Sequence, residues 1–207
     1  MRKYMSLVLA AICLLMGLTA CGEKQLTPDQ MFDTVEAAKN VRLEMQVNYD
    51  GIQTSSTIIE QAGDITKVRM ETSSFGATSG DEYYTETVGD EQYLYAKNEE
   101  GVWVKEKIGE WFTPASVDGF AGLFADGLYY KDEEKGKEYR MYESSSVELD
   151  SMTFRDAELK QDEDGNFVLT AVVTRTIDEM PVYGSVTLTI RVGGEVKVTL
   201  PKAEIVK

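Results

Sequence analysis

Apolar and polar residues alternate along most of the chain after residue 40. Val41, Leu43, Met45, Val47 and Tyr49 are separated by single polar residues, the pattern of a β-strand with one buried face. Turn-forming residues recur about every ten positions and indicate tight connections between such strands. The pattern predicts an antiparallel meander of about 11 strands. These lie near 41–49, 54–61, 67–72, 82–88, 91–97, 102–108, 138–144, 152–160, 166–177, 183–192 and 195–205.

Two segments have helical rather than strand periodicity. The first is predicted at 28–39, where Thr27 suits the N-cap, Pro28 suits the first turn and Gln30 completes a capping box. The second is predicted at 114–127, in an apolar stretch. This second helix is expected to be weak, because each glycine lowers helix stability by up to about 1 kcal/mol relative to alanine. Its three glycines are Gly119, Gly122 and Gly127.

A sheet of this length cannot stay flat, because strand twist accumulates from one strand to the next. Its apolar face needs a cover, and the two short helices are the segments available to provide it. We therefore expect a mainly β (α+β) domain over residues 27–207. Its core would be a single strongly curved antiparallel sheet, or half-barrel, wrapped over two short helices. A two-sheet β-sandwich is the alternative.

The N-terminus has the pattern of an export signal. Arg2 and Lys3 precede the apolar run 7–16, which is too short to span a membrane but suits a signal peptide. The sequence Leu18-Thr19-Ala20-Cys21 follows and resembles the lipobox of bacterial lipoproteins. The resemblance implies cleavage after residue 20, a diacylglycerol group on Cys21 and a short tether at 21–26. The protein would then be anchored on the extracytoplasmic face of the cell membrane.

Composition narrows the possible functions. The 207 residues carry a formal net charge of −15 and include no histidine. An acidic surface disfavours nucleic acid and anionic lipid headgroups as partners. The absence of histidine excludes Ser-His-Asp triads and histidine-ligated metals.

No stretch of the sequence predicts catalysis or metal binding. Residues 162–166 are the most metal-like, but the distal glutamate of a calcium loop is missing and a polar turn is the preferred interpretation. The other acidic clusters also fall at predicted turns. Because no catalytic motif occurs, we expect no enzymatic activity, no metal and no cofactor.

Three consecutive predicted strands carry a pattern that supports a family resemblance. They contain Glu82-Tyr83-Tyr84, Tyr93-Leu94-Tyr95 and Val102-Trp103-Val104-Lys105. With the lipobox, the N-terminal helix and the order of strands, they make the chain similar to LolA/LppX-like lipoproteins, including uncharacterised examples of Gram-positive bacteria. The resemblance implies an unclosed barrel over helices that binds or senses an apolar ligand, such as a lipid, glycolipid or lipopeptide.

Large and adaptable side chains near the predicted helix cover suit an apolar pocket. Residues 114–127 are expected to act as a mobile lid over it. The alternative function is a non-enzymatic interaction module for another envelope protein or a cell-wall polymer. A carrier needs several hundred cubic ångströms of lined space, whereas an interaction module can be packed solid. The candidate ligand-lining residues are Met45, Met70, Trp103, Phe120, Leu123 and Phe124.

Overall fold

A computed structural model of the chain describes residues 26–49, 52–109, 112–136, 138–149, 152–177, 179–194 and 196–205. The predicted signal peptide and Cys21 lie outside the described residues. Within the described part, no helix is both long enough and apolar enough to cross a membrane.

The protein is mainly β, with one 13-stranded sheet that does not close into a barrel. Neighbouring strands follow the order β13-β6-β5-β4-β3-β2-β1-β12-β11-β10-β8-β7, and β9 pairs with β10. All pairs are antiparallel except β13 with β6. The strands are β1 (Asn40–Tyr49), β2 (Gln53–Ala62), β3 (Ile65–Ser74), β4 (Ala77–Val88), β5 (Glu91–Lys97), β6 (Trp103–Lys107), β7 (Tyr129–Asp132), β8 (Glu138–Met141), β9 (Val147–Leu149), β10 (Met152–Gln161), β11 (Phe167–Ile177), β12 (Met180–Val192) and β13 (Glu204–Ile205).

The prediction of a single sheet is confirmed, but the predicted number of about 11 strands is wrong. Strands β7 and β9 were missed because four and three residues are too few to establish an alternating pattern. The strand predicted at 195–205 is reduced to Glu204 and Ile205, which pair in parallel with Val104 and Lys105 of β6. The two-sheet sandwich is not the observed architecture.

Helix α2 (Pro28–Glu36) begins where the sequence predicts. The Thr27 hydroxyl accepts a hydrogen bond from the Gln30 backbone N–H at 3.4 Å, and the Gln30 side chain accepts one from the Thr27 N–H at 3.1 Å. This reciprocal pair is the predicted capping box. The helix ends three residues before the predicted residue 39.

Helix α3 (Val117–Ala125) begins three residues later than predicted, with Ser116 as its N-cap. The Ser116 hydroxyl accepts a hydrogen bond from the Gly119 N–H at 3.0 Å. The residue before it is held by a tertiary contact, because the Ala115 N–H donates to the Tyr83 hydroxyl at 3.1 Å. That contact ties the helix entry to β4.

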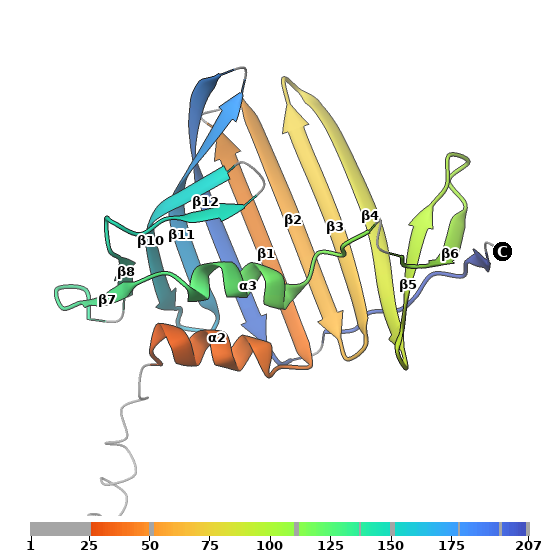
Figure 1. Ribbon diagram of the computed structural model, residues 1–207, viewed down its shortest axis with the longest axis horizontal. Helices are drawn as coiled ribbons and strands as arrows, with labels where there is room; N and C mark the ends of the chain where they lie inside the picture. Colours follow the sequence, from red (N-terminus) through yellow and green to blue (C-terminus); the bar gives the residue numbers. More distant parts are fainter. Residues whose placement is uncertain are drawn as a thin grey trace, which may run out of the picture.

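Both helices lie on one face of the sheet, which we call the helix face (Figure 1). Alternate residues of β1 point to it, and Leu43 in the centre of that strand is fully buried. Helix α2 contributes Met31, Phe32 and Val35 to the core. Helix α3 packs against α2, β1 and β9. We call the other surface of the sheet the outer face.

The two ends of the sheet differ. Helix α2 connects directly into the start of β1, so it lies at one end. The loops of the β1–β2, β3–β4 and β11–β12 hairpins lie at the other end, as the antiparallel register requires. We call this second end the tip end, and it is at the top of Figure 1.

Candidate functional site

Four of the six predicted ligand-lining residues come together. Met45 and Phe124 are buried in the core, and Phe120 and Leu123 are partly buried against it. The Phe124 ring packs edge-on against Phe154, with ring centroids 5.6 Å apart. Helix α3 therefore places its aromatic residues on the helix face, where the sequence interpretation put them.

A small gap, lined by none of these four residues, lies elsewhere on the helix face. The gap between α2 and the sheet has a volume of about 10 Å³, enough for roughly one water molecule. Its walls are entirely apolar. They are Met31, Phe32, Val35, Leu159, Phe167, Leu169, Leu188 and Ile190.

The three glycines of the predicted lid have different surroundings. A β-carbon at Gly127 would lie 2.6 Å from the Met141 methyl carbon and 2.8 Å from a Tyr129 ring carbon, so both side chains would have to shift to admit it. A β-carbon at Gly119 would lie 3.0 Å from the Ser116 hydroxyl. At Gly122 no atom lies within 4 Å of the added carbon. Only Gly122 therefore has free room for a larger residue among these three.

The other two predicted ligand residues lie elsewhere. Trp103 is on the outer face, because its register through β5 and β4 places it on the same side as Tyr84. Its ring meets the Tyr84 ring edge-on at 5.4 Å, and the Lys97 ammonium lies 5.2 Å from its centroid. Met70 is on the helix face, in the same cross-strand row as Met45, but it is 38% exposed.

Met70 lines a groove of about 500 Å³ between β4 and the end of β5. We call this groove the β4 slot. Strand β5 pairs only with residues 84–88 of β4 and then diverges, as Figure 1 shows. Within the part of the chain that the structure describes, residues Ala77–Tyr83 of β4 consequently have β3 on one side and no strand on the other. The slot is lined by Arg69, Met70, Glu71, Thr78, Ser79, Gly80, Asp81, Glu82, Tyr83, Ala96 and Lys97.

The tip end carries three exposed apolar side chains from three hairpins. Phe75 of the β3–β4 loop is 90% exposed, Met180 at the start of β12 is 66% exposed and Ile52 of the β1–β2 loop is 48% exposed. Phe75 also has a backbone φ of 50°. Left-handed backbone is strained for a bulky residue and usually holds glycine or asparagine. An exposed aromatic ring on a strained loop serves no evident purpose in folding.

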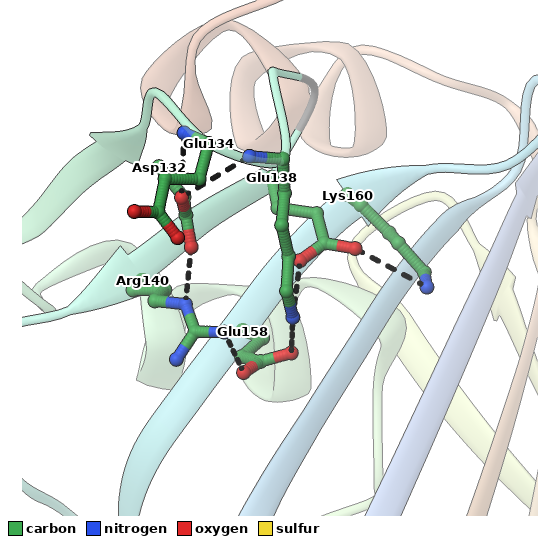
Figure 2. A network of polar contacts seen from close by, with 7 residues as sticks. Asp132, Glu134, Glu138, Arg140, Glu158 and Lys160 are labelled. Atoms are coloured by element: carbon green, nitrogen blue, oxygen red, sulfur yellow. Dashed lines mark hydrogen bonds and ion pairs between the residues drawn. The ribbon is translucent and has the colours of Figure 1, made fainter.

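A network of ion pairs joins β7, β8 and β10 (Figure 2). The Arg140 guanidinium binds Asp132 at 2.7 Å and Glu158 at 2.8 Å, and Lys160 lies 3.7 Å from Glu138. Desolvation alone would raise the pKa of Asp132, but hydrogen bonds from backbone N–H groups and from Arg140 outweigh it and lower the pKa. A carboxylate held in its charged form by such partners is a structural anion rather than a general acid.

The acidic turn at 162–166 has the structure of a polar turn. The Asp162 carboxylate accepts hydrogen bonds from the Asp164 and Asn166 backbone N–H groups at 3.0 and 2.8 Å, and from the Asn166 side chain at 2.9 Å. These bonds occupy both carboxylate oxygens. Among the described residues, no three His, Cys, Asp or Glu side chains are grouped as a metal site would require.

No protein-family model and no curated protein sequence matches this chain. The proposed function therefore rests on the fold and on the geometry of the surface.

Sequence reasoning missed the two most unusual surface features, the β4 slot and the exposed Phe75. The Phe75-Gly76 pair, between two polar stretches, was the available signal for a hairpin loop with an exposed aromatic residue. The slot had no such signal, because it depends on where β5 stops pairing with β4.

Proposed function

We propose that the protein is a lipid-anchored, extracytoplasmic interaction module that binds a protein partner at its tip end and has no enzymatic activity. The observation that carries this proposal is Phe75, which combines 90% exposure with a left-handed backbone. Large exposed aromatic residues are frequent anchors of protein interfaces. Residues held in sparsely populated backbone regions are concentrated at active sites, ligand clamps and switch regions.

Anchoring through Cys21 would orient the tip end away from the membrane. Leu26 is the fifth residue after Cys21, so the start of α2 would lie within about 18 Å of the bilayer. Strand β1 has ten residues and spans about 33 Å. The apolar side chains of the tip end would therefore face a partner beyond the membrane rather than the lipid that holds the anchor.

The proposed partner is a protein with an apolar pocket and a basic rim. Phe75, Met180 and Ile52 supply apolar contacts from adjacent hairpins. The net charge of −15 favours basic surroundings and disfavours anionic lipid headgroups. We place the chain among half-barrel lipoproteins of the LolA/LppX type, with the strongly curved sheet as the scaffold that holds the three hairpins in line.

Binding of an apolar ligand under α3 is the second candidate function. It is favoured by the open space beside Gly122 and by the partial exposure of Phe120 and Leu123. The ligand would be a lipid, glycolipid or lipopeptide that enters when α3 moves away. Phe124 of α3 is buried and its ring packs on Phe154 at 5.6 Å, so the core under α3 would first have to expand, which places this candidate second.

Photo-crosslinking in the organism that makes the protein tests the first proposal. A benzoyl-phenylalanine replaces Phe75 in the full chain, and in a control it replaces Val88, an exposed residue at the opposite end of the sheet. We expect a discrete adduct from position 75 and none from position 88. Equal labelling from both positions, or none from position 75, contradicts the proposal.

Solvent extraction separates the two candidates. Residues 22–207 are purified under native conditions, extracted with organic solvent and the extract is examined by mass spectrometry. A stoichiometric lipid, together with no adduct at position 75, would favour the carrier. A lipid-free protein that forms the adduct favours the interaction module.

A further inference from the structure

Among the described residues, the edge of β4 that faces away from β3 pairs with no other strand over seven residues, Ala77–Tyr83. Because a strand edge presents unpaired N–H and C=O groups, it is a template for another strand. We propose that an extended segment of the partner adds to β4 in the β4 slot as an extra strand of the sheet. This inference rests on the proposed function and specifies how the partner is held.

The register identifies which backbone groups face the slot. The Thr87 N–H donates to the Asp64 carbonyl at 2.9 Å, so odd-numbered residues of β4 bond toward β3. In an antiparallel ladder the intervening residues direct their N–H and C=O groups to the other side. Thr78, Gly80 and Glu82 therefore present three donors and three acceptors to the slot.

The fold covers its other edges but leaves this one open. The C-terminal segment adds β13 to the edge of β6. Strand β7, at the far end of the sheet order, has only four residues and carries charged side chains. Lysine, proline and bulges protect many edges; none occurs between Ala77 and Tyr83, where the charged residues are Asp81 and Glu82.

The slot has suitable dimensions for a peptide. Its volume of about 500 Å³ lies within the range of ligand sites. One wall is the β4 edge and the other is formed by Ala96 and Lys97 of the diverging β5. Gly80 has no side chain, and its surroundings leave no room for one. A β-carbon at this position would lie 2.9 Å from the Met70 carbonyl oxygen. The backbone of Gly80 is consequently open to close approach.

The charge of the slot specifies the segment further. Glu82 is paired with Lys67 at 3.0 Å, and Arg69 is paired with Glu71 at 2.5 Å. Among the described residues, no ion pair is formed by Asp81, which points to the helix face and is exposed. A lysine or arginine of the segment, placed opposite Asp81, would form an ion pair with its carboxylate. Asp81 would then have an ion-pair partner, as Glu71 and Glu82 do. The occupant is therefore an extended segment with at least one basic side chain on one face.

The slot and the exposed ring belong to one surface. Phe75 is two residues before Ala77, so the ring and the first open residue of β4 lie on the same hairpin. A partner that places Phe75 in an apolar pocket has its backbone within reach of the β4 edge. The ring would provide affinity, and the strand would fix the orientation of the partner.

Proline substitution tests the inference, because it removes one backbone donor. Thr78→Pro and Gly80→Pro each remove an N–H that faces the slot and break no hydrogen bond to β3. Gly80→Pro also adds a β-carbon 2.9 Å from the Met70 carbonyl oxygen, so Gly80→Ala, which adds the same carbon and keeps the N–H, is its control. Thr78→Val is the matched control, since it retains the N–H and loses only the hydroxyl. In the full chain with benzoyl-phenylalanine at position 75, we expect both proline variants to lower the adduct yield about tenfold. The valine control should stay within about twofold.

Hydrogen exchange provides a second readout that needs no substitution at the edge. In the purified adduct we expect exchange of the Thr78, Gly80 and Glu82 amides to slow at least tenfold relative to the free protein. If both proline variants fold and give full yield, or if these amides are unprotected, strand addition is wrong while the interaction module stands. If position 75 gives no adduct, both proposals fail. An adduct that contains only a second copy of this chain overturns the assignment of a foreign partner.

Discussion

Replacing Phe75 by asparagine is predicted to stabilise the domain. Phe75 and Gly76 have φ values of 50° and 83° and connect the paired residues Ser74 and Ala77. Two consecutive left-handed residues form the hairpin loop for which Asn-Gly is the preferred sequence. Left-handed backbone costs a bulky residue about 1–2 kcal/mol, and a ring that is 90% exposed contributes little burial in return. We expect Phe75→Asn to raise the free energy of unfolding by about 1 kcal/mol.

Urea and thermal unfolding of residues 22–207 measure this change. A gain of about 1 kcal/mol corresponds to about 2–4 °C in melting temperature for a domain of this size. Phe75→Ala is the control, because it removes the ring but keeps a β-carbon on the strained backbone. Its stability should remain within about 0.5 kcal/mol of the parent protein. A loss of more than about 1 kcal/mol in either variant would show that the ring stabilises the fold. The proposed role of Phe75 in binding would then lose its support.

Two further predictions concern packing and pH. Gly127→Ala should lower stability by about 1–3 kcal/mol in urea unfolding, because Met141 and Tyr129 would have to shift and the β-carbon would also lie 3.1 Å from the Phe124 carbonyl oxygen. Gly122→Ala, in open space, should instead raise stability by about 0.5–1 kcal/mol, and a destabilising Gly122→Ala would contradict this assignment. Hydrogen bonds from Lys105 and a tyrosine hydroxyl lower the pKa of Glu86. Its stabilisation is therefore present above the unfolded pKa of about 4.3 and is lost as the pH falls through the lower folded pKa. Glu86→Gln should flatten stability against pH between about 5 and 3, and an unchanged curve would exclude Glu86 as a contributor.

The parts of the fold that the sequence predicted are those in which one face of a strand is buried. Alternation located β1 because Leu43 and its neighbours on the helix face are excluded from water. It missed the first half of β4, from Ala77 to Asp81, because both faces of that segment are exposed and no alternation arises. It also overextended the last strand. Residues 196–203 alternate in sequence but have no neighbouring strand to pair with.

The candidate ligand residues were only partly brought together, for a related physical reason. A period of two shows that alternate residues share a face of a strand, but it does not show which face a helix covers. Trp103 was predicted to line a ligand pocket because it is large and apolar, yet the register places it on the outer face. Met45 and Phe124, which were predicted to line the same pocket, are buried among apolar neighbours in the core.

The difference between the two ends of the sheet relates the proposed lipid anchor to the exposed Phe75 ring and the unpaired edge of β4. The β4–β5 loop, with Gly89 at φ 63°, lies at the α2 end and uses a residue that left-handed backbone accepts without strain. The β3–β4 loop at the other end of the same strand uses Phe75 instead. Both loops place a residue in the left-handed region, and neither backbone requires an aromatic side chain there, so the turn itself does not account for Phe75. A requirement that acts only at the end facing away from the proposed lipid anchor does account for it, and contact with a partner is such a requirement.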